Sequence, residues 1–165
     1  MIRELVHVSA NLRQDGGGAA HLGRVVGRAM RRYCSRHGLH FRGLHLPESD
    51  GHPALDGYDC FGGSPVALAT RLWRLQALGG RERSLVFDHL GPSRAQSRLP
   101  GLLRSRYAVF LLGIEAWRAL EPDRRRALAG ARRLLAISRT TRERALPRLG
   151  DAREKREGLF RMGCA

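Results

Sequence analysis

The residue types in this sequence that could bind or transform a small ligand follow short apolar runs. Three glycines come soon after ELVHVS, a histidine directly follows SLVFD, and a carboxylate and an indole come after YAVFLL. A serine ends the run LLAIS and a threonine comes shortly after it. These candidate residues are Gly16, Gly17, Gly18, His89, Glu115, Trp117, Ser138 and Thr140.

Gly16, Gly17 and Gly18 precede a helical pattern and could bind a phosphate group there. At a helix N-terminus, free backbone N–H groups and the helix dipole favour an anion. The spacing matches neither the dinucleotide-binding pattern G-x-G-x-x-G nor a P-loop. A tight turn that needs glycine for its positive φ explains the same residues equally well, so both interpretations stay open.

His89 and Glu115 are the candidate catalytic residues. A histidine at a strand end could exchange a proton with a substrate hydroxyl. The alternative, a histidine hydrogen-bonded to nearby backbone, is favoured for this residue taken alone. Glu115 could orient a sugar hydroxyl. The indole of Trp117 could stack on a sugar ring, but packing against the core is favoured for it.

Six apolar runs predict the strands that would position these residues. They cover residues 4–9, 39–46, 58–61, 84–88, 107–112 and 134–138. Several runs are continuous rather than alternating, which is typical of strands covered on both faces.

Helical patterns separate the runs. After the glycines, apolar residues recur at helical spacing up to Gly38, with arginines at the other positions. The apolar positions are Leu22, Val25, Val26, Ala29, Met30 and Tyr33. A second helix is expected from Pro65 to Gly79, with Ser64 as its N-cap. A third is expected to start near Pro122 and to run through DRRRALAGARR.

The order of strands and helices predicts one α/β domain over residues 1–148. Thr140 and Glu143 have the spacing of a capping box and predict a fourth helix. The alternation favours a Rossmann-like parallel sheet with helices on both faces. We expect the charged tail, 149–165, to be irregular and to add no strand. Ligands of open parallel sheets bind beyond the carboxyl ends of the strands, where the candidate residues would meet.

The chain is strongly basic, with 30 lysine and arginine residues against 15 aspartate and glutamate residues and a net charge of +15. A basic surface binds phosphate groups, so an anionic membrane surface and nucleic acid are both candidate partners. We expect no nucleic-acid partner, because no recognised motif is present and few aromatic residues lie among the arginines. The run DRRRALAGARR predicts a solvated helix face.

Cys34, Cys60 and Cys164 are far apart and match no metal-ligand spacing. We expect reduced thiols in a cytoplasmic protein with no metal ion and no cofactor. The N-terminus lacks the continuous apolar segment of a signal peptide, and no run reaches the roughly 18 apolar residues of a membrane span. Peripheral contact with the inner face of the membrane stays an option.

Four segments, taken in order, resemble one family of enzymes. VSANLRQDGGGAAHLGRVVGRAMRRY, LVFDHLG, YAVFLLGIEAWRAL and ARRLLAISRTTRERA are similar to the N-terminal half of family 4 glycosyltransferases of the GT-B fold. The similarity covers about residues 1–148. The resemblance implies transfer of a sugar, generally with retention, from a nucleotide sugar to a glycan or lipid acceptor, without an essential metal.

The resemblance also implies roles for the candidate residues. Gly17 and Gly18 would approach the phosphate of the donor, and Glu115 takes the acidic position of an HGxE motif. Ser138 and Thr140 belong to the strand-end motif that faces the cleft.

Two departures from the family pattern limit what the chain is expected to do alone. Leu112 stands where many relatives have a histidine, and His89 on the neighbouring strand end is the nearest replacement. The second domain of the family, which carries the donor nucleotide site and paired glutamates, has no counterpart in this sequence. We therefore expect negligible transfer by the chain alone, unless a second polypeptide completes it. The alternative is a non-enzymatic basic module that binds an anionic membrane surface or nucleic acid.

Overall fold

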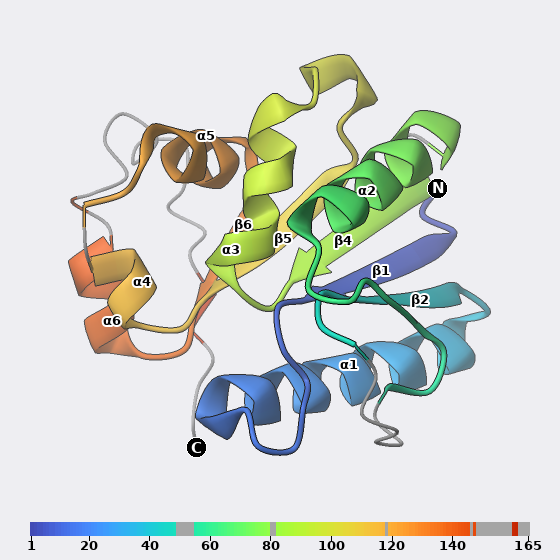
Figure 1. The fold of residues 1–165 in the computed structure, drawn as a ribbon, viewed down its shortest axis with the longest axis horizontal. Helices are drawn as coiled ribbons and strands as arrows, with labels where there is room; N and C mark the ends of the chain where they lie inside the picture. The colour runs from blue at the N-terminus through green and yellow to red at the C-terminus, as the bar shows by residue number, and fades with distance from the viewer. Residues whose placement is uncertain (49–54, 80–81, 118, 146, 148–159, 162–165) are drawn as a thin grey trace.

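Six parallel strands form the centre of the computed structural model. The structure describes residues 1–48, 55–79, 82–117, 119–145, 147 and 160–161. The strands are β1 (Glu4–Ser9), β2 (His40–His45), β3 (Tyr58–Cys60), β4 (Arg83–Phe87), β5 (Arg106–Leu111) and β6 (Arg133–Ala136). Their order in the sheet is β3-β2-β1-β4-β5-β6 (Figure 1). All neighbouring pairs are parallel, so the predicted Rossmann-like α/β fold is confirmed.

A two-residue strand, β7 (Phe160–Arg161), pairs in parallel with β6 and extends this sheet by one strand. The expectation that the tail adds no strand is therefore wrong at these two residues, which are too few to carry a strand pattern in the sequence. The rest of the tail predicted to be irregular, 149–165, lies outside the described residues.

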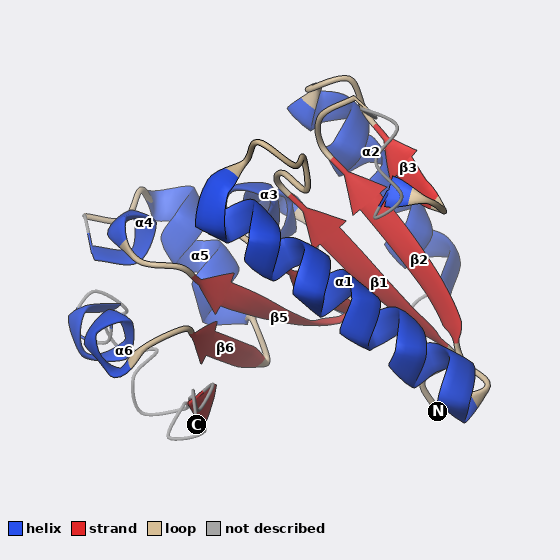
Figure 2. Cartoon of the chain, turned by 90° about the horizontal axis from the view of Figure 1, so that it is seen from below, coloured by secondary structure: helices blue, strands red, loops and turns tan. Residues whose placement is uncertain are grey.

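Helices cover both faces of the sheet. α1 (Gly17–His37) lies on one face, and α2 (Pro65–Gly79), α3 (Leu90–Ser93) and α5 (Pro122–Gly130) lie on the other (Figure 1, Figure 2). The shorter elements are η3 (Arg94–Arg98), η4 (Gly101–Leu103), α4 (Ile114–Trp117) and α6 (Arg139–Ala145). The main core lies on the side of α2, where Leu68 and Leu72 join Phe87, Val109 and Leu111 in one buried cluster.

The predicted helix boundaries hold best where a cap or a proline sets them. The Oγ of Ser64 accepts the N–H of Ala67 at 3.2 Å at the start of α2, as predicted. α5 starts at Pro122, as predicted, but ends at Gly130. It cannot run through the whole arginine segment, because Arg133 already belongs to β6.

The predicted capping box of α6 is wrong. Ser138 is the residue that caps this helix, since its Oγ accepts the N–H of Thr141 at 3.1 Å. Thr140 lies within the first turn and is exposed. Glu143 pairs instead with Arg139 of the same helix, at 2.7 Å.

α1 packs on the sheet by a different face from the one that its apolar pattern predicted. The buried residues of α1 are Ala20, Gly23, Gly27 and Cys34. Val25 and Tyr33, from the predicted apolar face, are 40% and 51% exposed. A Cβ on Gly27 would overlap the hydroxyl of Tyr58. Since polar side chains of the sheet fill the space beneath the helix, only a stripe of small residues can approach it.

Candidate functional site

The candidate residues lie beyond the carboxyl ends of four strands. β1 and β4 are neighbours at the point where the strand order reverses, and ligands of parallel α/β proteins bind at this switch point. The glycine turn follows β1 and His89 follows β4, while Glu115 and Trp117 follow β5, and Ser138 and Thr140 follow β6. The structure thus brings all of them to one edge of the sheet.

Gly16, Gly17 and Gly18 form an open turn at the start of α1. Gly17 has a φ of +67°, a conformation that favours glycine, so the turn interpretation is confirmed at this residue. A Cβ on Gly17 or Gly18 would meet no described atom within 4 Å, whereas one on Gly16 would lie 2.5 Å from the Cβ of Ala20. The space beside Gly17 and Gly18 is therefore open to a ligand.

Three side chains from three different segments hold the loop that leads into this turn. Arg24 of α1 donates to the carbonyl of Leu12 at 3.0 Å. His45 of β2 accepts the N–H of Leu12 through Nε2 at 3.0 Å. Asp88, directly after β4, accepts the N–H of Ala10 through Oδ1 at 3.1 Å. The sequence analysis did not identify Arg24 and His45 as anchors, because an arginine on a helix and a histidine within a strand carry no signal of a loop contact. It did not assign a loop contact to Asp88 either.

A cluster of buried polar side chains lies beneath α1, next to these anchors. His7 Nδ1 is 2.6 Å from the Oη of Tyr58, and His7 Nε2 is 3.7 Å from the Oδ2 of Asp88. The side chains of His7 and Asp88 are 0% and 4% exposed. The backbone of α1 closes over them at Gly23 and Gly27, where a Cβ would lie 2.5 Å from Asp88 Oδ2 and 3.1 Å from His7 Nδ1.

Burial shifts the protonation of this cluster toward its uncharged forms. Burial, together with the smaller effect of the nearby His45, lowers the pKa of His7 to about 3. Burial raises the pKa of Asp88 to about 7, against opposing polar contacts from Ser9 and Ala10. His7 and Asp88 therefore face each other as a neutral imidazole and a carboxyl group that titrates near neutral pH.

The two candidate catalytic residues, His89 and Glu115, interact with each other through charge. Burial lowers the pKa of His89, the charge of Glu115 opposes this shift, and Arg124 adds to it. The Nδ1 of His89 accepts the N–H of Gly91 at 3.0 Å, which is the backbone contact favoured from the sequence. The proton of the neutral ring is therefore on Nε2. Glu115 Oε1 accepts the N–H of Leu112 at 2.7 Å.

The remaining candidates have structural contacts. Trp117 packs against the buried core, as favoured from the sequence, and the guanidinium of Arg144 lies 4.6 Å from the centre of its ring. The Oγ of Ser138 caps α6, and that hydroxyl is also 3.0 Å from the Oγ1 of Thr141. Thr140 is exposed beside it.

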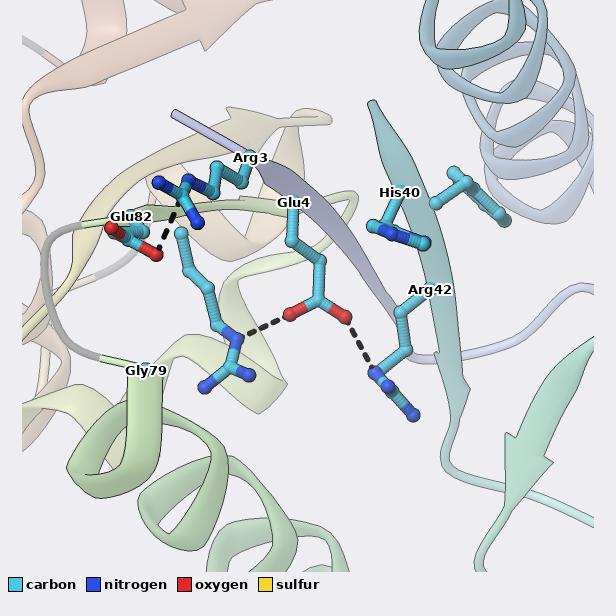
Figure 3. A pocket seen from close by; sticks show the side chains of 8 residues that line it. Arg3, Glu4, His40, Arg42, Gly79 and Glu82 are labelled. Carbon is cyan, nitrogen blue, oxygen red and sulfur yellow. Dashed lines mark hydrogen bonds and ion pairs between the residues drawn. The ribbon is translucent and has the colours of Figure 1, made fainter. Parts of the chain in front are cut away.

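A hollow of about 340 Å³ lies at the opposite edge of the sheet, where β1, β2 and β4 begin (Figure 3). Glu4 lies between Arg42, at 2.8 Å, and Arg83, while Arg3 and Glu82 form an exposed pair at 3.7 Å. Burial raises the pKa of Glu4, but hydrogen bonds from Arg83 and Arg42 outweigh burial and hold that pKa below its ordinary value. These charges satisfy one another, so we interpret the hollow as a structural ion-pair network.

Within the described ranges, no group of three or more His, Cys, Asp or Glu side chains is arranged to hold a metal ion. None of the helices in those ranges is long and apolar enough to cross a bilayer. No family model, no curated protein and no solved structure matches this chain. The geometry at the carboxyl ends of the strands is therefore the basis for inferring a function.

Proposed function

We propose that this chain supplies the acceptor-side half of a sugar-transfer site and binds the phosphate of a nucleotide sugar at the glycine turn. One observation carries the proposal: the turn is open, is held by Arg24, His45 and Asp88, and lies at the switch point of the sheet. α1, which starts at this turn, is 21 residues long. Its free N–H groups and its dipole favour a phosphate at that position.

In this proposal, His89 and Glu115 act on hydroxyl groups. The Nε2–H of His89 donates to a sugar hydroxyl, because Nδ1 already accepts from Gly91. Glu115 uses Oε1 for the backbone of Leu112 and leaves Oε2 to accept from a hydroxyl. Transfer forms a bond between the acceptor oxygen and the anomeric carbon, and it breaks the bond from that carbon to the phosphate oxygen. The proton of the acceptor hydroxyl passes to the departing phosphate oxygen, and the nucleoside diphosphate leaves.

The chain is expected to bind the donor without appreciable turnover. By the resemblance described above, the groups that hold the nucleotide come from a second domain. Holding two reactants together contributes about 7–11 kcal/mol in well-oriented systems. Leu112, at the position of the family's histidine, has no hydrogen-bonding side chain. Robust sugar transfer by the purified chain would refute this part of the proposal.

Binding tests the proposal directly, with a matched pair of substitutions at Gly18. Calorimetric titration with a panel of nucleotide sugars should give a Kd of about 1 mM or tighter for at least one of them. Gly18→Asp places a carboxylate where the phosphate would lie and should weaken binding about tenfold or more. Gly18→Asn has the same size without the charge and should change the Kd less than about threefold.

Both variants should fold, because a side chain at this position meets no described atom within 4 Å. Aspartate in the first turn of a helix also interacts favourably with the helix dipole. Equal loss of binding in the two variants would assign the effect to bulk rather than charge. The proposal fails if no member of the panel binds at millimolar concentration.

A further inference from the structure

We infer that the solvent-facing side of α1 is a docking surface for an anionic lipid bilayer. This surface, called the outer face here, consists of Val25, Arg28, Ala29, Arg32, Tyr33 and Arg36. Its positions follow the spacing i, i+3, i+4, i+7, i+8, i+11, so they form one continuous face of the helix about 16 Å long. The inference does not depend on the proposed sugar site.

The direction of this face follows from the way α1 packs. Ala20, Gly23, Gly27 and Cys34 are buried toward the sheet, so the outer face lies on the opposite side of the helix. All six residues of the outer face are exposed. In Figure 2, which views the sheet from the side of α1, the helix lies in front of the strands.

The outer face combines a row of apolar residues with a row of arginines. Val25, Ala29 and Tyr33 are four residues apart, and so are Arg28, Arg32 and Arg36 beside them. Exposed fractions of 40% for Val25 and 51% for Tyr33 are high for large apolar side chains on a helix that packs against a sheet. Tyr33 also stacks on His37, with 4.2 Å between ring centres, which extends the apolar row toward the end of α1.

The charge of this face has no counter-charge among the residues that the structure describes. The sequence of α1 contains no aspartate or glutamate between Gly17 and His37. Among the described residues, no ion pair or hydrogen bond is found for the side chains of Arg28, Arg32 and Arg36. Arg24 and Arg31 differ, because they donate to backbone carbonyls of Leu12 and Asp56. Three guanidinium groups without a partner in the described part of the chain therefore lie on the side of α1 away from the sheet.

A bilayer surface suits this combination better than nucleic acid does. Anionic headgroups attract arginines, and the boundary below them takes up small apolar side chains and the amphipathic ring of a tyrosine. Phosphates of a nucleic acid would bind the arginines as well, but they would gain nothing from Val25 and Ala29. A row of aromatic side chains for base stacking is also lacking on this face.

Sedimentation of the full chain with lipid vesicles tests the inference. Vesicles of phosphatidylcholine with 30% phosphatidylglycerol should bind the chain at 0.1 M salt, and vesicles of pure phosphatidylcholine should not. Each arginine near a charged surface contributes about fivefold to binding. The triple variant R28Q/R32Q/R36Q should therefore lose about 100-fold. The variant V25S/Y33S, which keeps every charge, should lose about fivefold or more.

A matched control distinguishes binding through the outer face from an effect of the total charge of the chain. R125Q/R126Q/R132Q removes three arginines that are also exposed but lie on and after α5, so its net charge equals that of the outer-face variant. This control should keep binding within about threefold. Equal loss in the two triple variants, absence of binding to anionic vesicles, or outer-face binding to an RNA duplex without vesicle binding would each overturn the inference.

Discussion

At the scale of single residues, the unusual feature is a carboxyl group buried without a countercharge. Asp88 uses Oδ1 to hold the loop after β1, while Oδ2 has no hydrogen-bond partner among the described residues. Among the described residues, the ionisable group that faces Oδ2 is the neutral His7, whose Nε2 is 3.7 Å away. Asp88 is thus a loop anchor whose burial favours the protonated carboxyl group up to about pH 7.

The two shifted pKa values have opposite effects on stability. Asp88 has a raised pKa, about 7 against 3.8, so it removes stability as the pH rises from about 4 to 7. His7 has a lowered pKa, about 3 against 6.5, so it adds stability as the pH rises between those values. The two contributions cancel between about pH 4 and 6.5, where the pair should leave stability independent of pH.

We predict that D88N removes this cancellation. Asparagine still accepts the N–H of Ala10, and only the His7 contribution then remains. The free energy of unfolding of D88N should rise relative to the parent chain by about 1.4 kcal/mol per pH unit between pH 4 and 6.5, on the order of 3 kcal/mol in total. Urea denaturation at a series of pH values measures it, and parallel profiles of the two proteins would contradict it.

At the scale of elements, the packing of α1 depends on glycine rather than on apolar side chains. Gly23 and Gly27 let the helix backbone approach the polar cluster closely, and this turns Val25 and Tyr33 outward. The apolar periodicity of this helix therefore extends onto an exposed face at Val25, Ala29 and Tyr33, against the usual interpretation of such a pattern. Leu22, Val26 and Met30 of the same pattern are half-buried.

We predict that G27A destabilises the fold, although alanine is the better helix former. The added Cβ would overlap the Tyr58 hydroxyl and lie 3.1 Å from His7 Nδ1. Overpacking should cost about 2 kcal/mol or more, beyond the roughly 1 kcal/mol that alanine gains in helix propensity. G18A, on the same helix but in open space, is the control and should change stability by less than about 1 kcal/mol. Similar Tm values for both variants would show that α1 does not pack by Gly27.

At the scale of the whole molecule, polar side chains hold the sheet at both ends of its strands, the carboxyl edge and the amino edge. At the carboxyl edge, Asp88 and His45 hold the loop after β1. At the amino edge, Glu4 of β1 binds Arg42 of β2 and Arg83 of β4, and Arg83 also donates to the carbonyl of Leu75 near the end of α2. The ion pairs thus join three strands, and the hydrogen bond to Leu75 links them to α2.

We predict that E4Q weakens the entire domain. The substitution leaves two partly buried guanidinium groups without their carboxylate, which should cost about 2 kcal/mol. E82Q is the matched control, because its pair with Arg3 is 75% and 55% exposed and should be worth less than about 1 kcal/mol. Thermal unfolding of both variants measures the difference. Equal Tm values would mean that the network at Glu4 contributes no more than a surface pair.

The fold was largely predictable because its signals are local. The bounds of β1 match the prediction, and the ends of the other strands differ from it by at most two residues. The agreement is close because each strand is an apolar run that ends at a polar residue or a turn. The common edge of the candidate residues follows from parallel topology. The polar cluster was not predictable, because His7 meets Tyr58 across 51 positions and neither residue lies in a motif. The outward face of α1 depends on that same cluster.

The close approach of α1 also has a meaning for how such a chain could change over evolutionary time. Positions 7, 27, 58 and 88 are far apart in the gene, yet their atoms share one small volume. A side chain at position 27 fits best when the hydroxyl at position 58 is lost, and an ionised group at position 88 is stabilised when position 7 carries a cation. Substitutions at these four positions are therefore expected to be coupled, so that the cost of one depends on which residues occupy the other three.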